Sequence, residues 1–418
     1  MLIAQLGFWC EAFHLDSCRA GFLSGVPRQV KSLILVLSLN TLAVGYFIVF
    51  LTGYLPQEGI SSRLIGTIVG AEGITMVIAG IPLGLLSDRK GRKWILTVSA
   101  AGLSPVLFIL AFTRNPALLI FSGIIAGMAE GGFLSTVNAT IADQTPTASR
   151  NSAFSFSFLL STIFSGLGLS LSFIFPFLET LLGFTSAEMH EDVLIIFGSL
   201  VIATPFSLFF LLRNYKEKTS QDSIASSPDN MKNLVKFSGA NSLIGLGAGF
   251  IIPLIATWFF LKFGISDNYS GPLLAISNIT MGMSALLSPR MSRRFGIVRA
   301  IAINQGLSTV FMISLAFVGG PVLAASLYVI RAALMNMSSP LSDSFLMGLV
   351  PKERRGLASA INSVVWRLPN SVTTIIGGAI LASGNYSLPF ELAALFYIIA
   401  ISLFYTFFKD FEISQTVS

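Results

Sequence analysis

The sequence carries little charge and very few cysteine or histidine residues. Asp, Glu, Lys and Arg make up 11% of its 418 residues, less than half of the roughly 25% found in soluble proteins. This excludes an ordinary soluble enzyme, because a soluble chain of this length surrounds its core with charged side chains. Both cysteines, Cys10 and Cys18, lie in the first twenty residues, so the rest of the chain has no disulfide framework.

What is missing also argues against binding of metal ions, nucleotides and nucleic acids. Two histidines are too few for a buried metal centre, and Cys10, His14 and Cys18 on a terminal tail are weak evidence for one. No Gly-x-x-x-x-Gly-Lys-Ser/Thr loop occurs, so no ATP site of that type is expected. The net charge of +6 comes from short basic clusters between apolar runs, which is typical of membrane loops. We predict no enzymatic activity, no cofactor, no metal and no nucleic-acid partner.

The composition is instead strongly apolar. Hydrophobic residues make up 53% of the chain and Phe occurs 36 times. A helix needs about 20 mainly apolar residues to cross roughly 30 Å of hydrocarbon, and the runs of this length are much longer than the strands of membrane barrels. They predict an all-α integral membrane protein that is embedded in the lipid bilayer. The twelve predicted spans are residues 32–55, 62–86, 94–113, 117–142, 153–178, 193–212, 238–261, 270–288, 299–319, 321–346, 357–383 and 390–408.

The basic residues predict the orientation of these spans. If residue 31 is cytoplasmic, 21 of the 26 Lys and Arg lie in cytoplasmic segments and three lie outside. Cytoplasmic loops carry this excess of positive charge. The predicted outer loop 179–192 agrees, because it contains four acidic residues and no Lys or Arg. We therefore expect a multi-pass protein of the cell membrane whose tails, 1–31 and 409–418, are both cytoplasmic.

Landmarks that recur 205 residues apart indicate an internal repeat. Gly91 and Gly296 follow spans 2 and 8, Arg150 and Arg355 follow spans 4 and 10, and Lys31 and Lys236 precede spans 1 and 7. Three landmarks at one offset predict two parallel six-span halves, 32–212 and 238–408. The polar segment 213–237 between them is predicted to be a cytoplasmic linker.

The loop after span 2 carries a recognisable motif. Residues 84–93 read Gly-Leu-Leu-Ser-Asp-Arg-Lys-Gly-Arg-Lys, which resembles the loop signature Gly-x-x-x-Asp-Arg-x-Gly-Arg-Lys of the major facilitator superfamily of secondary transporters. The copy in the second half has Arg293 where the Asp would stand. The resemblance covers residues 32–408 and implies the fold of that superfamily, with two halves that alternate access to a central site.

The resemblance also implies a cytoplasmic gate. Asp88 is expected to face the start of span 11, where free backbone N–H groups favour an anion, and Arg92 is expected to pair with Asp143. The alternative is that this cluster only fixes the topology. The full set of expected gate residues is Gly84, Asp88, Arg89, Gly91, Arg92, Asp143, Arg150, Asp343 and Arg355.

Charges inside the spans are candidates for the transport site, because each costs about 2.5–3.5 kcal/mol at the bilayer centre unless it faces a partner or a cavity. At about 1.5 Å per residue, Glu130 and Arg367 lie at similar depths, as do Glu72 and Arg331. We expect each pair to meet across a central cavity, with Glu130 as the first candidate for proton binding. Alternatively, some of these charges are only structural ties between helices. Neutral candidates for the cavity wall are Asn40, Tyr46, Asn138, Asn336 and Trp366.

These features together predict a monomeric, proton-coupled secondary transporter that exports a small organic solute. Two departures from the family weaken a drug-export interpretation: Gly127 stands at the arginine position of the span 4 motif, and residues 165–168 lack the usual Gly-Pro pair. One alternative is a facilitator or organic-anion carrier that binds its substrate through Arg331 and Arg367. Another is a transporter-like receptor that no longer transports.

Overall fold

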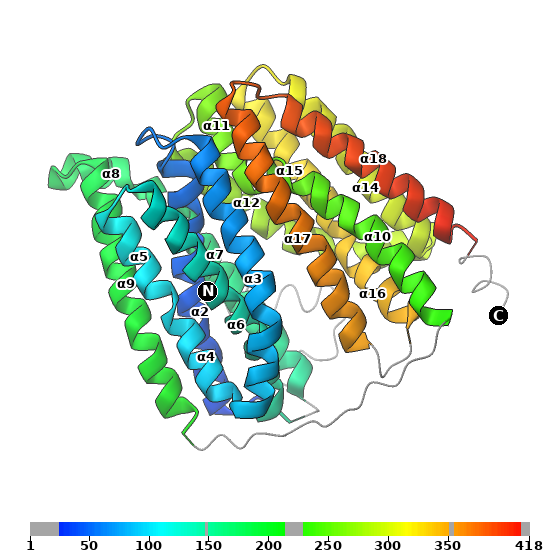
Figure 1. Cartoon of the computed structure of the whole chain (residues 1–418), viewed down its shortest axis with the longest axis horizontal. Coiled ribbons are helices and arrows are strands. Elements are labelled where there is room, and N and C mark those ends of the chain that lie inside the picture. Colours follow the sequence, from blue (N-terminus) through cyan, green and yellow to red (C-terminus); the bar gives the residue numbers. More distant parts are fainter. Residues whose placement is uncertain (1–24, 147–148, 214–228, 351–354, 411–418) are drawn as a thin grey trace.

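The computed structural model of the chain describes residues 25–146, 149–213, 229–350 and 355–410. Every regular element in this part of the chain is a helix (Figure 1). Eleven helices are long and apolar enough to cross a membrane, and a bent pair with a 44° break, α12 (Asp267–Ala285) and α13 (Ser288–Phe295), makes the twelfth. The prediction of an all-α membrane protein with twelve spans is therefore confirmed. Most of the predicted tails and linker lies outside the described residues.

The spans of the first half follow their predicted limits closely. The exception is the predicted outer loop 179–192, which is mostly helical. Gly183 ends one helix with a left-handed backbone (φ 74°), and Thr185 and Glu188 form a capping box that starts the next one. The elements are α2 (Arg28–Val49), η2 (Phe50–Tyr54), α3 (Ser62–Lys90), α4 (Arg92–Ala101), α5 (Leu103–Phe112), α6 (Pro116–Gln144), α7 (Arg150–Ser170), η4 (Leu171–Ile174), α8 (Phe175–Leu182) and α9 (Ser186–Leu211).

The second half repeats this arrangement. Its first helix begins at Asp229, so the end of the predicted linker 213–237 is already helical. The elements besides α12 and α13 are α10 (Asp229–Gly249), η5 (Ile252–Leu254), α11 (Ile255–Phe263), α14 (Ile297–Phe317), α15 (Pro321–Met337), α16 (Ser339–Leu349), α17 (Arg355–Ala382) and α18 (Leu388–Phe408).

The backbone carries the same 205-residue offset as the sequence. Gly91 and Gly296 each separate two helices with a positive φ, 113° and 81°, and Gly59 and Gly264 do so at 79° and 67°. Glycine adopts such angles without steric cost. The equivalent turns of the two halves therefore share one backbone geometry, which is what a parallel repeat requires.

The two halves contact each other at one end of the molecule and diverge toward the other (Figure 1). At the contact end α3 packs on α17 so closely that a Cβ atom on Gly66 would lie 2.8 Å from the Thr374 carbonyl oxygen and 2.9 Å from Gly378 Cα. The Thr257 hydroxyl of α11 donates a hydrogen bond of 2.6 Å to the carbonyl of Thr52 in η2. These contacts hold the halves together at the contact end.

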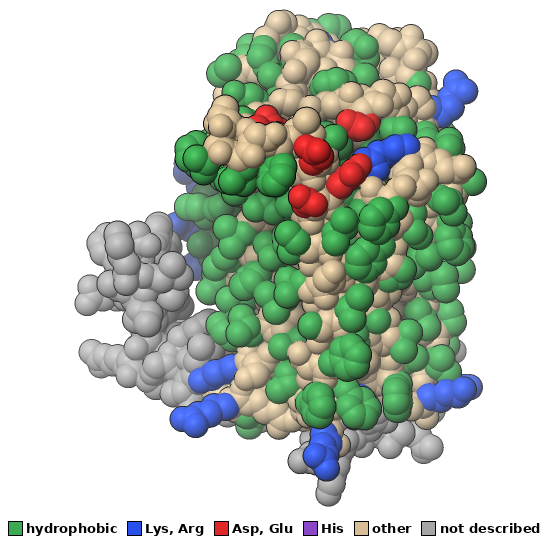
Figure 2. Space-filling view, turned by 90° about the vertical axis from the view of Figure 1, so that its left-hand side faces the viewer, with side chains coloured by type: hydrophobic (Ala, Val, Ile, Leu, Met, Phe, Trp, Pro, Cys, Tyr) green, Lys and Arg blue, Asp and Glu red, His purple; other side chains and the backbone are tan. Residues whose placement is uncertain are grey.

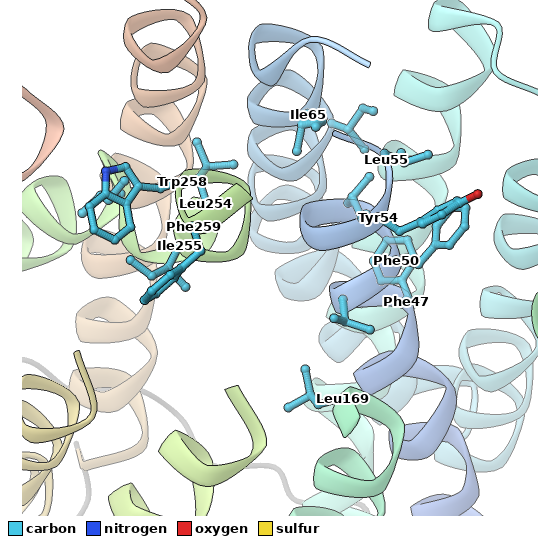
Figure 3. Close-up of a cluster of buried hydrophobic side chains, with 14 of the residues drawn as sticks. Phe47, Phe50, Tyr54, Leu55, Ile65, Leu169, Leu254, Ile255, Trp258 and Phe259 are labelled. Atoms are coloured by element: carbon cyan, nitrogen blue, oxygen red, sulfur yellow. The ribbon is translucent and has the colours of Figure 1, made fainter. Parts of the chain in front are cut away.

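The hydrophobic core follows the same division. At the contact end one cluster combines side chains of both halves, such as Phe50 and Tyr54 with Trp258 and Phe259 (Figure 3). Two other clusters each belong to a single half, one around Phe345 and one made of residues from α2, α4, α6, α7 and α9. The structure is therefore a wedge with a shared core at the contact end and separate cores toward the open end.

The outer surface suits a lipid environment. Large apolar side chains such as Phe112, Phe177 and Phe210 are 73%, 67% and 71% exposed. Figure 2 shows an apolar band over this face, with acidic side chains gathered near one end of it. A band of exposed apolar side chains of this kind is expected where a protein contacts lipid.

Candidate functional site

A cavity of about 240 Å³ lies between the two halves. Its first-half wall comes from α2, η2, α3 and α6, and its second-half wall comes mainly from α17. Apolar and aromatic side chains, including Phe47, Met76 and Trp366, form much of the surface, and Asn370 and Ser371 add hydrogen-bonding groups. This combination of an apolar wall and a few polar groups is typical of sites for small organic molecules.

Three of the four charges that were predicted for the transport site line this cavity: Glu72, Glu130 and Arg367. Glu72 and Glu130 come from adjacent helices and lie close enough to repel one another, whereas Arg367 attracts Glu130 from the opposite half. The Arg367 guanidinium Nη1 also lies 3.6 Å from the sulfur of Met76 on α3. Glu130 and Arg367 thus face the same cavity from different halves, although no direct ion pair joins these two described side chains.

The predicted pair between Glu72 and Arg331 is wrong. Arg331 is only 4% exposed and lies within the second half, where its side chain interacts with Tyr328 and Tyr397. Glu72 has Glu130 as its charged neighbour instead. Counting residues along a helix gives the depth of a side chain but not its direction around the helix axis, and the two charges point to different places.

Two neutral candidates lie near the charges. Trp366 lines the central cavity. Asn40 lines a smaller cavity of about 60 Å³ inside the first half, whose wall also includes Glu72 and Glu130. The Asn40 side-chain oxygen accepts a hydrogen bond of 3.2 Å from the Thr204 hydroxyl. The two carboxylates therefore stand between a cavity shared by the halves and a smaller one within the first half.

The other three neutral candidates do not line either cavity. Tyr46 is completely buried, and its hydroxyl lies 2.6 Å from His190 Nδ1. The Asn336 amide contacts the Met281 sulfur at 2.9 Å, which joins α15 to α12. Asn138 is exposed on α6 but is absent from both cavity walls. A polar side chain within a predicted span indicated a buried or functional position. It did not distinguish a residue that faces a cavity from one that forms a contact between two helices.

Near the open end, the predicted ion pair between Arg92 and Asp143 is present. It joins the start of α4 to the end of α6, and Arg150 donates a hydrogen bond of 3.3 Å to the Ala142 carbonyl in the same region. Both contacts lie within the first half. Gly84 allows α3 to approach α6, because a Cβ atom there would lie 3.4 Å from Ser135 Cβ.

The remaining gate candidates make few described contacts. Arg89 and Asp343 are exposed. The side chains of Asp88 and Arg355 lie outside what the structure describes, so the expected contact between Asp88 and the start of α17 is not placed. Within the described residues no group of three His, Cys, Asp or Glu side chains could hold a metal ion, and Cys10, His14 and Cys18 lie outside that part of the chain.

A buried polar cluster at the contact end was not predicted from the sequence. His190 of α9 and Asp267 of α12 lie 3.3 Å apart between Nε2 and Oδ2, and both are almost completely buried. The apolar pattern of the sequence predicts a loop at His190 and places Asp267 just before a span. The capping box at Thr185 and Glu188 was the available signal, because it starts α9 early enough to include His190.

Comparisons with known proteins agree with this geometry. The family model of the Major Facilitator Superfamily matches residues 33–374 and 237–415. The chain is 24% identical to the multidrug resistance protein MdtG of Rahnella sp. (strain Y9602) over 320 residues, which are 75% of this chain and 76% of that protein. It is 24% identical to the quinolone resistance protein NorA of Staphylococcus aureus (strain N315) over 367 residues, covering 84% and 90% of the two chains.

Solved structures share the fold. The nucleoside transporter NupG superposes with a TM-score of 0.73 at 15% identity, covering 92% of this chain and 100% of NupG. A D-xylose–proton symporter gives a TM-score of 0.69 at 17% identity, covering 90% and 97%. With a family model that spans both halves, and with the fold of known transporters, the chain belongs to the major facilitator superfamily of membrane transporters.

Proposed function

We propose that this transporter exports a small organic solute in exchange for protons. It would alternate between the wedge described above and a state that is open at the contact end. The observation that carries the proposal is the central cavity, where two carboxylates of the first half, Glu72 and Glu130, face Arg367 of the second half. We further propose that the open end faces the cytoplasm, with both termini, and that the monomer is the working unit.

Proton coupling rests on the closeness of Glu72 and Glu130. Two neighbouring carboxylates act as one coupled group, because a single proton removes their mutual repulsion. Protonation also removes the attraction between Glu130 and Arg367, which acts across the two halves. A proton on this pair therefore weakens an attraction that acts between the two halves. Because the halves move relative to each other in every cycle, a proton gradient can drive the cycle in this way.

The walls of the cavity support an amphipathic solute. Phe47, Met76 and Trp366 provide apolar and aromatic contacts, whereas one arginine and two carboxylates favour an uncharged or cationic group over an anion. An organic-anion carrier is less well supported, because Arg331 is buried away from the cavity. The names of the relatives MdtG and NorA refer to resistance against several drugs and against quinolones, and resistance by a transporter supports export.

Transport in proteoliposomes tests this proposal. We expect an imposed pH gradient to drive movement of a lipophilic fluorescent cation such as ethidium by the parent protein. Glu130→Gln should lose this pH-driven transport but still bind the cation, because the cavity wall is otherwise unchanged. Glu191→Gln, which alters an exposed glutamate outside the cavity, is the matched control and should behave like the parent. If Glu130→Gln responds to the gradient like the parent, Glu130 is not the coupling group.

A further inference from the structure

The contact end contains a titratable group that the proposed coupling site does not use. His190 has no exposed surface, and it is surrounded by aromatic rings. Tyr54 stacks on it with ring centroids 3.7 Å apart, and Phe175 lies edge-on at 4.8 Å. An imidazole that is buried this deeply is a satisfied core residue unless a charged partner faces it.

A charged partner does face it, and from the opposite half. His190 Nε2 lies 3.3 Å from Asp267 Oδ2, and neither atom has another partner among the described residues. The second carboxylate oxygen of Asp267 accepts a hydrogen bond of 2.8 Å from the Gln57 amide. Because α9 belongs to the first half and α12 to the second, this contact crosses the interface that must break when the contact end opens.

The surroundings accommodate both protonation states of the imidazole. The Tyr46 hydroxyl, 2.6 Å from Nδ1, can donate to a neutral ring or accept from a protonated one. The titratable groups that face the ring are therefore Tyr46, Tyr54 and Asp267. More distant charges are already engaged, since Glu58 accepts a hydrogen bond from Tyr54 and Glu191 lies 3.8 Å from Arg114. The change on protonation is thus concentrated in the interaction with Asp267.

We propose that His190 and Asp267 form a second proton-binding site, which holds the contact end closed while His190 is protonated. With the proton bound, an imidazolium and a carboxylate attract each other across the two halves. Without it, Asp267 is a buried anion with no cation beside it, and this state favours separation of the halves. The proposal rests on the proposed transport function, in which the contact end opens during each cycle.

The position of the site determines what its proton can do. Because His190 is fully buried in the closed contact end, its proton exchanges with solvent only after that end has opened. The proton is then taken up from one side of the membrane and returned to the same side. This site therefore makes opening sensitive to the acidity on that side without carrying a proton across, and in this it differs from Glu72 and Glu130.

Distances between two spin labels at the contact end test the proposal. The labels are placed on Ser186→Cys and Ser383→Cys, which are exposed at the ends of α9 and α17, in a protein whose Cys10 and Cys18 are replaced by serine. In lipid nanodiscs, the population with the longer distance should grow between about pH 5 and about pH 8, by at most about tenfold per pH unit for one proton. The comparison is made in a background that carries Glu72→Gln and Glu130→Gln, so that the proposed coupling site cannot contribute to the pH response. The dependence should persist in this background, and adding His190→Gln should abolish it.

A second measurement does not rely on a variant of His190. The chain has only two histidines, so His14→Gln leaves His190 as the single ring that NMR of isotope-labelled histidine can follow. We expect its signals to change with pH, and this change to differ when Asp267 is replaced by Asn. A ring that keeps one protonation state throughout overturns the proposal, as does a pH response that survives when His190→Gln is added to the Glu72→Gln and Glu130→Gln background. Neither experiment needs a solute or a gradient, so its outcome is independent of the transport test on Glu130.

Discussion

Closing of the contact end depends on the fit between α3 and α17, and a single methyl group tests this dependence. In Gly66→Ala the new Cβ would lie 2.8 Å from the Thr374 carbonyl oxygen and 2.9 Å from Gly378 Cα. Both are backbone atoms, so no flexible side chain can move aside. Overpacking of this kind costs about 1–3 kcal/mol, which changes the ratio of closed to open molecules by about five- to about 150-fold.

The matched control is Gly80→Ala on the same helix. There the nearest atom, the Gly131 carbonyl oxygen, is 3.5 Å away, which is an ordinary contact. Both variants gain the same helix propensity of about 1 kcal/mol, so only the contact between the halves differs. With the labels at Ser186 and Ser383, we expect Gly66→Ala to enlarge the long-distance population and Gly80→Ala to leave it unchanged. Equal distance distributions in the two variants would refute the reasoning.

Two further predictions follow from the open end and the topology. Asp88→Asn should slow transport while expression and membrane insertion stay normal, because the proposed gate needs its anion only when the open end closes; transport at the parent rate would leave Asp88 with a topological role at most. Single cysteines at Ser186 and Ser226 should react with an impermeant maleimide from opposite sides of the membrane, and reaction of both from one side would contradict the proposed orientation.

The sequence was sufficient for the fold because the lipid bilayer imposes a simple length rule. Apolar runs of span length, separated by turn residues such as Gly91 and Gly296, located the spans, although α9 begins at Ser186 rather than 193 and α10 at Asp229 rather than 238. The pair of Arg92 and Asp143 was also predictable, since the family resemblance implies it for an arginine of the loop motif and an acidic residue at the end of span 4. Each of these features depends on position along the chain alone.

The candidate site was only partly predictable, because it depends on direction around each helix. Glu130 and Arg367 line one cavity, whereas Arg331 and Tyr46 point elsewhere. His190 was overlooked for another reason: a helix start hidden in an acidic segment was interpreted as a loop. Helix rotation and the partners of buried polar groups are set by packing between helices that are distant in sequence.

The π-helical turn η2 has a consequence for how the first half responds when the halves part. A turn with hydrogen bonds of the i to i+5 type, here from the Leu55 N–H to the Phe50 carbonyl, inserts one residue into the helix and leaves a carbonyl without an internal partner. The Thr52 carbonyl receives its hydrogen bond from Thr257 of the other half. Separation removes that donor, so this carbonyl loses a hydrogen bond that the other half supplies. The end of span 1 therefore adds to the free-energy cost of opening the contact end.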